Sequence, residues 1–328
     1  MPVIDVHTHM LGQEWLNLLR EHGAPKYEVK DTKAGQETVF MHGSPFMTLL
    51  PEMLDFDLRI KNMDKAGVDL AVVSLTCPSA YWGGEEISAQ AASIMNGVMM
   101  EQQDRYPDRL RWFATLPWQY ADRAVAELDK AVKAGAAGVF VTANIDERSL
   151  TAEEFKPIWD AIDRYALPVL VHPTAPQGAK QMEMDEYGLI PPIGFMFDTT
   201  LAISRMIFDG FLDRYQRLSI IASHGGGALP YLAGRLDRCH ECIPACSENI
   251  SEPPSHYLRK IYYDTVVYEQ GALDLCIEVA GGPDRVMYGS DYPHNIGDMA
   301  GCLARVNNLD SQTASRIKGT TAERLFGL

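Results

Sequence analysis

The sequence has no excess of positive charge. Its 328 residues contain 29 Lys and Arg but 44 Asp and Glu, which gives a formal net charge of -15 at pH 7. A surface of this sign repels nucleic acid and anionic lipid, because both are negatively charged. We therefore expect neither a nucleic-acid partner nor attachment to a membrane surface.

Long hydrophobic runs and a targeting segment are also missing. No stretch approaches the roughly 18 consecutive apolar residues of a membrane-spanning helix, although 46% of the residues are hydrophobic. Residues 1–7 lack the basic region and apolar run that mark a signal peptide. We therefore expect a cytoplasmic protein, in which the six cysteines stay reduced.

Three of these cysteines, Cys239, Cys242 and Cys246, lie close together beside His240. A second metal site or a redox switch would be one interpretation of such a group. However, the spacing lacks the paired pattern of structural zinc ligands and would place all three thiols along one helix. We expect buried or unused thiols at these positions.

No internal repeat, low-complexity tract or linker divides the chain. Short apolar runs alternate with helical patterns, which is typical of βαβ units and a parallel sheet. Eight runs are candidate strands: residues 3–6, 70–75, 110–115, 138–141, 168–171, 218–222, 261–263 and 285–288. Eight such strands predict an α/β fold, a (β/α)8 barrel of the TIM type, in a single domain over residues 1–328.

Two connections are too long for a simple loop. A small insertion after the first strand covers about residues 10–58, and the alternating pattern of residues 27–41 predicts a β-hairpin within it. A loop rich in Pro, Met and aromatic residues covers residues 173–197. Long loops after barrel strands commonly form the walls and lids of pockets.

The polar residues at the strand ends indicate a site. His7 and His9 end the first strand, and residues two apart on a strand point to the same side. His172, His224 and Asp291 follow three later strands. Active sites of such barrels lie at the carboxyl ends of the strands, and three neutral imidazoles with a carboxylate suit a divalent metal such as Zn2+. A single histidine there would more often be an ordinary core or surface residue, but the combination favours a metal site.

The same segments resemble the amidohydrolase superfamily, and within it the branch that contains 2-amino-3-carboxymuconate-6-semialdehyde decarboxylase. The resemblance rests on four motifs: His7-Thr8-His9, Val171-His172-Pro173, His224-Gly225-Gly226-Gly227 and Gly289-Ser290-Asp291-Tyr292-Pro293. It extends over essentially the whole chain. It implies a metal-dependent decarboxylase with the same barrel fold.

Residue roles follow from this resemblance. It implies four metal ligands, His7, His9, His172 and Asp291, with His224 and Asp291 as the catalytic pair that moves protons. Arg235 matches an arginine that reaches across a dimer interface, so the resemblance implies a homodimer. Arg235, Phe46, Met47 and His294 are the expected substrate contacts.

Two departures from the pattern refine the expectation. Ser44-Pro45-Phe46-Met47 has Met47 where the related decarboxylase has an arginine that holds a substrate carboxylate, so the substrate should differ. Residues 138–144 contain no lysine, whereas members with two metals bridge them through a modified lysine on this strand. We expect one metal, Zn2+ with Mn2+ as the alternative, and no organic cofactor.

The expected function is non-oxidative decarboxylation of a small unsaturated or aromatic carboxylic acid. A hydrolase or hydratase acting on a related intermediate of aromatic degradation is the first alternative, because the metal ligands would be the same. A non-catalytic metal-binding protein is the second. The residues leave the exact substrate and its pathway open.

Overall fold

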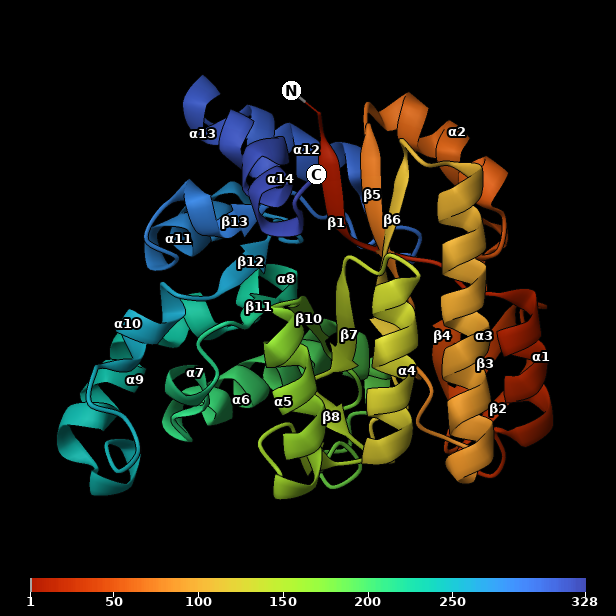
Figure 1. Cartoon of the computed structure of the whole chain (residues 1–328), viewed down its shortest axis with the longest axis horizontal. Helices are drawn as coiled ribbons and strands as arrows, with labels where there is room; N and C mark the ends of the chain where they lie inside the picture. Colours follow the sequence, from red (N-terminus) through yellow and green to blue (C-terminus); the bar gives the residue numbers. More distant parts are fainter. Residues whose placement is uncertain (1) are drawn as a thin grey trace.

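A computed structural model describes residues 2–328 and contains one closed barrel of parallel strands (Figure 1). In spatial order the eight strands are β1 (Ile4–His9), β5 (Leu70–Ser74), β6 (Leu110–Thr115), β7 (Gly138–Thr142), β10 (Pro168–His172), β11 (Ser219–Ala222), β12 (Tyr262–Asp264) and β13 (Val286–Met287). The barrel closes where Val6 N and His9 N donate hydrogen bonds to the carbonyl groups of Tyr288 and Tyr292. The predicted α/β barrel and its eight strands are confirmed.

The interior of the barrel is filled by apolar side chains from the strands. Together with Ala322 of the last helix they form one buried cluster: Ile4, Val6, Val72, Phe113, Phe140, Leu170, Ile221, Tyr262 and Met287. The ring of Phe326 in the last helix lies 5.6 Å from that of Phe113, so this helix packs against the cluster. Both chain termini lie at that end of the barrel (Figure 1). The polar residues His7, His9 and His172 lie at the opposite end, where the strands finish.

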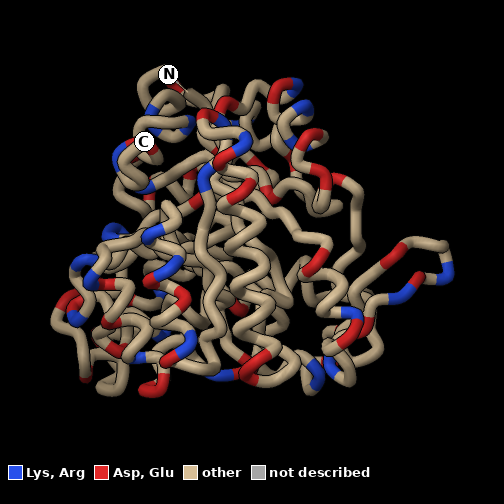
Figure 2. Tube along the Cα trace, turned by 45° about the vertical axis from the view of Figure 1, so that its right-hand side comes forward, with Lys and Arg blue, Asp and Glu red and all other residues tan. Residues whose placement is uncertain are grey.

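Helices cover the outside of the barrel, and most of the remaining buried apolar residues lie between them and the strands. The helices are α1 (Gln13–His22), α2 (Phe56–Ala66), α3 (Gly84–Arg105), α4 (Ala121–Lys133), α5 (Lys156–Tyr165), α6 (Phe195–Phe208), α7 (Phe211–Arg214), α8 (Ser223–Gly226), α9 (Leu229–Cys242), α10 (Pro254–Leu258), α11 (Gln270–Val279), α12 (Met299–Asn307), α13 (Ser311–Ser315) and α14 (Thr321–Phe326). Charged residues of both signs are spread along the outer parts of the trace (Figure 2), and few belong to the eight barrel strands. Within residues 2–328 no helix is both long and apolar enough to span a bilayer.

The insertion after β1 contains α1 and a three-stranded antiparallel sheet. The predicted hairpin is β2 (Tyr27–Asp31) with β3 (Glu37–Met41), and a third strand that was not predicted, β4 (Ser44–Thr48), pairs with β3. Pro45 is accommodated because β4 is an edge strand, where a missing N–H breaks no ladder. The chain then enters α2, whose first turn is capped by the Asp55 carboxylate accepting from Leu58 N. The insertion thereby brings Phe46 and Met47 toward the barrel mouth.

Two further segments surround the mouth. A two-stranded hairpin, β8 (Asn144–Ile145) with β9 (Arg148–Ser149), follows β7 directly. The long loop after β10 contains short turns and a π-helical segment, Ile190–Gly194, that runs into α6. With the insertion, these segments form the walls above the strand ends.

Candidate metal centre

Histidine and aspartate side chains from four strands meet at the mouth of the barrel. His7 and His9 belong to β1, and His172 ends β10. The Nε2 atoms of His7 and His9 lie 3.5 and 3.2 Å from Oδ1 of Asp291, which follows β13. Nε2 of His224, which follows β11, lies 3.6 Å from the other oxygen of Asp291. The five residues predicted from the strand ends are therefore neighbours in space.

Four buried atoms at the centre of this group have no hydrogen-bond partner within residues 2–328: Nε2 of His7, His9 and His172, and Oδ1 of Asp291. The other ring nitrogen of each histidine is engaged. His7 Nδ1 lies 2.6 Å from the Asp264 carboxylate, and His172 Nδ1 lies 2.8 Å from the Pro173 carbonyl. His9 Nδ1 lies 3.1 Å from the Leu75 carbonyl.

These contacts fix the tautomers, since carboxylate and carbonyl oxygens only accept hydrogen bonds. Nδ1 therefore carries the proton in all three histidines, and each Nε2 presents a lone pair. Metal-bound histidines in proteins are oriented in this way. Potential ligand atoms lie within 4.8 Å of one another in two groups that share Asp291: His7, His172, His224 and Asp291, and His9, Asp291 and His294. Unpartnered nitrogen and oxygen atoms in such a group fit one divalent cation.

The electrostatic environment of His9, His172 and Asp291 favours the charge states that a metal site needs. Burial lowers the pKa of His9 to about 3 and that of His172 well below its usual value, so both rings are neutral. Burial opposes ionisation of Asp291, but the neighbouring imidazoles of His224, His9 and His294 hold its pKa well below the usual range. Neutral imidazoles and an ionised carboxylate are the protonation states that bind metals.

Asp264, at the end of β12, connects two parts of the site. Its Oδ2 accepts hydrogen bonds from His7 Nδ1 and, at 2.9 Å, from His224 N. Its Oδ1 accepts from the backbone amides of Gly225 and Val266. Burial disfavours the charge, yet the His7 ring and the donated hydrogen bonds lower the pKa of Asp264. One buried carboxylate thus orients a candidate ligand and the turn that carries His224.

The backbone at His224 and Asp291 is strained. Both residues adopt left-handed conformations, with φ of 55° and 58°, which non-glycine residues rarely do. After His224 the chain passes so close to β12 that a Cβ on Gly226 would lie 2.7 Å from the Tyr263 ring. The glycines after His224 therefore allow close packing at the site, and the turn points the imidazole inward.

Arg59 supports the site, although it was not selected from the sequence. It is completely buried, and it donates to Thr8 Oγ1 at 2.8 Å and to the His9 carbonyl at 2.6 Å. Its guanidinium stacks over the Tyr292 ring at 4.7 Å, and Thr8 Oγ1 donates to the Tyr292 carbonyl. Arg59 therefore ties the strand with His7 and His9 to the turn with Asp291.

A cavity of about 290 Å3 opens onto these groups. Its lining includes His172, His224 and Asp291 from the centre and the predicted contacts Phe46, Met47 and His294. His294 Nε2 lies 3.0 Å from Thr76 Oγ1, and its ring lies 5.0 Å from that of His9. Phe195, at the start of α6, contributes another apolar wall. The cavity has the size and mixed character of a site for a small organic molecule.

Arg235 does not reach this cavity within its own chain. It lies on α9, where only Leu229 is buried, and its side chain is exposed. Cys239, Cys242 and Cys246 are free thiols that are partly or fully exposed, and within residues 2–328 they form no metal-binding group with His240. The sequence predicts buried or unused thiols at these positions, and none of the three is buried.

Comparison with known proteins agrees with the fold. The sequence profile of the amidohydrolase family (Amidohydro_2) matches residues 4–328. The chain is 26% identical to a 2-amino-3-carboxymuconate-6-semialdehyde decarboxylase of Dictyostelium discoideum, over 99% of this chain and 91% of that protein. It is 27% identical to a gamma-resorcylate decarboxylase of Rhizobium radiobacter, over 94% and 97% of the two chains.

A solved structure of similar shape is that of a dihydroxybenzoic acid decarboxylase from Polaromonas sp. JS666, with bound manganese and the inhibitor 2-nitroresorcinol. It superposes with a TM-score of 0.82 at 22% identity and covers 100% of this chain and 97% of that one. At this identity the likeness concerns the fold.

Proposed function

Because the chain belongs to the amidohydrolase family, we propose that it is a metal-dependent, non-oxidative decarboxylase of a small aromatic or unsaturated carboxylic acid. The observation that carries the proposal is the set of four unpartnered atoms, three imidazole nitrogens and a carboxylate oxygen, beside a partly apolar cavity. Relatives named as decarboxylases of aromatic acids support the reaction class.

In this proposal His7, His9, His172 and Asp291 hold one divalent cation. The absence of lysine in β7 and in the residues just after it supports a single ion. Nitrogen and oxygen ligands accept both Zn2+ and Mn2+. We propose Zn2+, with Mn2+ as the alternative that the related manganese-containing structure supports. When bound, the cation would act as a Lewis acid that offsets negative charge on substrate oxygens.

His224 and Asp291 handle the proton in the proposed reaction. Loss of CO2 leaves an electron pair on the substrate carbon, and a proton must take the place of the carboxyl group. His224 Nδ1 has no hydrogen-bond partner within residues 2–328, while its Nε2 lies 3.6 Å from Asp291 Oδ2. Asp291 can thus stabilise the protonated ring, and the strained turn at His224 holds the ring toward the cavity.

The cavity favours a flat, mainly apolar substrate. Phe46, Met47 and Phe195 supply apolar surface, and His294 offers a polar ring at the same cavity. Met47 cannot bind a carboxylate, so a second carboxyl group on the substrate has no partner at this position. A hydroxylated aromatic monocarboxylic acid suits these walls better than a dicarboxylic acid.

Arg235 is proposed to act in a homodimer. Its guanidinium is exposed and has no ion-pair partner within residues 2–328, and Tyr231 on the same helix is 82% exposed. A second copy packed against α9 would cover Tyr231 and could receive Arg235 at its own site, where a guanidinium would match a substrate carboxylate. Sedimentation of the Tyr231→Asp variant tests this: we expect a monomer with little activity, and an unchanged dimer with full activity would contradict it.

Product analysis tests the reaction. Metal-loaded protein is incubated with a panel of hydroxybenzoic acids, and CO2 and product mass are measured. We expect one CO2 per product, a product lighter by CO2, and loss of turnover in His224→Asn. A product heavier by one water, as a hydratase or hydrolase would give, contradicts the proposal. Full turnover in His224→Asn would contradict the assigned role of the imidazole.

A further inference from the structure

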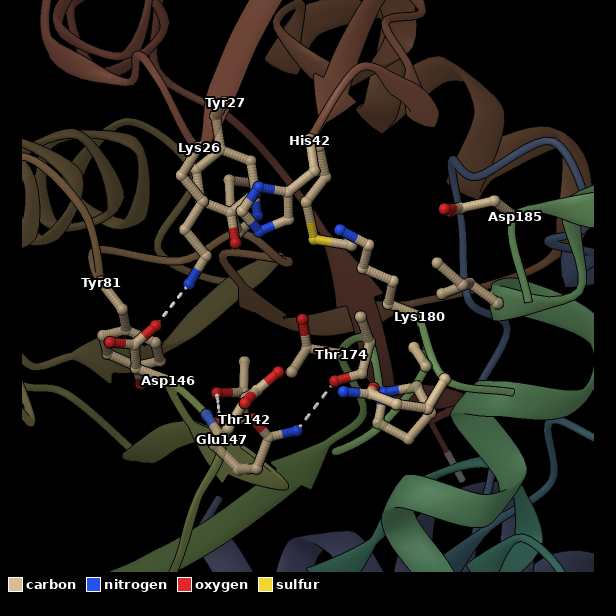
Figure 3. A pocket seen from close by; sticks show the side chains of 18 residues that line it. Lys26, Tyr27, His42, Tyr81, Thr142, Asp146, Glu147, Thr174, Lys180 and Asp185 are labelled. Carbon is tan, nitrogen blue, oxygen red and sulfur yellow. Dashed lines mark hydrogen bonds and ion pairs between the residues drawn. The ribbon is translucent and has the colours of Figure 1, made fainter. Parts of the chain in front are cut away.

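A second cavity, of about 440 Å3, lies near the metal centre at the same end of the barrel. No residue that lines it also lines the metal cavity, and none is a proposed metal ligand. Its walls come from the sheet of the insertion, the loop after β5, the β8–β9 hairpin and the loop after β10 (Figure 3). The proposed decarboxylation leaves this space without a use.

Apolar side chains form much of the wall. Tyr27, Met41, Pro78 and Ile190 line the cavity. The Tyr27 ring lies 6.3 Å from that of Phe46, which lines the metal cavity. A layer of aromatic side chains therefore separates the two cavities at this point, and a ligand of the second cavity would contact apolar surface.

Tyr81 supplies a buried polar group. Only 6% of its surface is exposed, and its hydroxyl is buried without a hydrogen-bond partner within residues 2–328. Ser79 and Thr142 lie near the hydroxyl but not in hydrogen-bond geometry. Burial raises the pKa of Tyr81, so the group stays protonated. An unpartnered buried hydroxyl is unfavourable, and a polar ligand in this cavity would relieve it.

Charges of both signs surround the cavity. Lys26 and Asp146 form an ion pair of 2.6 Å between the insertion and the β8–β9 hairpin. Lys180 and Glu147 have no ion-pair partner within residues 2–328, and they enter from different walls (Figure 3). His42 and a further unpaired carboxylate, Asp185, also line the space. A free cation and free anions at one small cavity suit a ligand that carries both charges.

The hairpin that presents Glu147 is held in a strained conformation. Asp146 and Glu147 are the two residues of its turn, and both are left-handed, with φ of 50° and 64°. Such turns normally contain Asn-Gly, because other residues are unfavourable there. Glu147 N donates to Asn144 Oδ1, and the Glu147 carbonyl accepts from the Gln177 amide. These hydrogen bonds fix the backbone of the turn from which the Glu147 side chain extends.

We propose that this cavity binds a small zwitterion of the amino-acid class with an apolar side chain. Its ammonium group pairs with Glu147 and its carboxylate pairs with Lys180. The Tyr81 hydroxyl forms a hydrogen bond to the polar end that lies nearest, and the side chain packs against Tyr27 and Met41. The inference stands apart from the proposed reaction, because it uses none of the metal-binding residues.

Isothermal titration of the full-length protein with L-phenylalanine tests the proposal. The titration is done with metal-loaded and metal-stripped protein, since amino acids chelate metals. 3-Phenylpropionate and phenethylamine serve as probes that each lack one charge. The variants are Lys180→Met, Glu147→Gln and Tyr81→Phe, with Lys133→Met on the exposed end of α4 as the matched control.

We expect saturable binding of one L-phenylalanine per chain with or without metal, and binding about tenfold weaker for each single-charge probe. Lys180→Met and Glu147→Gln should weaken binding by a similar factor, Tyr81→Phe should weaken it less, and Lys133→Met should not. Absence of saturable binding would overturn the proposal. So would an affinity for L-phenylalanine in the Lys180→Met and Glu147→Gln variants equal to that of wild type, or binding of 3-phenylpropionate as tight as that of L-phenylalanine. Binding that disappears with the metal would place the amino acid at the metal centre and would also overturn it. None of these results depends on CO2 release.

Discussion

Replacing Asp264 by asparagine changes which nitrogen of His7 carries the proton, while the shape of the site stays nearly the same. Oδ1 of Asp264 accepts from Gly225 N and Val266 N, while Oδ2 accepts from His7 Nδ1 and His224 N. The oxygen of asparagine can still accept from Gly225 N and Val266 N, but its NH2 group then faces two hydrogen-bond donors, His7 Nδ1 and His224 N. His7 must shift its proton to Nε2 so that Nδ1 can accept, and Nε2 can no longer bind a cation.

We expect Asp264→Asn to lower metal affinity about 10- to 100-fold, the usual effect of losing the partner of a metal-bound histidine. Competition with a chromophoric chelator measures it. Asp198→Asn is the control, because Asp198 is also buried but, among the described residues 2–328, accepts only from Asn144 Nδ2 and Thr174 N. Unchanged metal affinity in Asp264→Asn would refute the tautomer reasoning, and an equal loss in Asp198→Asn would show that any buried aspartate has this effect.

Three other predictions concern residues around the site. Arg59→Met should lower metal affinity and destabilise the fold by about 3 kcal/mol or more, since it removes buried hydrogen bonds to Thr8 and His9; full stability in urea denaturation would contradict this. Burial raises the pKa of Asp198 from 3.8 to about 7, so the folded protein holds a proton that the unfolded chain has lost. The contribution of this proton to the free energy of unfolding is complete below about pH 4 and is lost as the pH rises to about 7. Because asparagine does not titrate, the melting temperature of Asp198→Asn minus that of wild type should rise over that range. A constant difference would contradict the raised pKa of Asp198. Met47→Arg should improve KM for an aromatic dicarboxylic acid about tenfold, by one charge-assisted hydrogen bond, and an unchanged KM would place the substrate elsewhere.

The barrel and the residues of the metal centre could be predicted from the sequence because each depends on a short pattern. Buried parallel strands appear as apolar runs, and a histidine or aspartate directly after such a run lies at the barrel mouth. His7 and His9 share a side because they are two residues apart on β1. The carboxyl ends of all parallel strands meet at one end of a barrel, so five distant residues could be placed together without knowing any loop.

The remaining features depend on contacts that no local pattern records. β4 was missed because Pro45 and a short edge strand give a weak alternating signal. Arg59 lies on an ordinary helix, and its burial follows only from the position of α2 against β1 and Tyr292. The second cavity forms where the sheet of the insertion, the β8–β9 hairpin and two loops meet, and the conformations of such segments depend on tertiary contacts such as the Lys26–Asp146 ion pair.

A crystal structure of the metal-loaded protein, with anomalous data at the absorption edge of the added ion, tests the central claim most directly. The claim is that the unpartnered Nε2 atoms of His7, His9 and His172 and Oδ1 of Asp291 hold one divalent cation. We predict a single anomalous peak per chain, with all four atoms about 2.0–2.3 Å from it. A peak bound elsewhere, two peaks in the barrel mouth, or none at saturating metal would contradict the account.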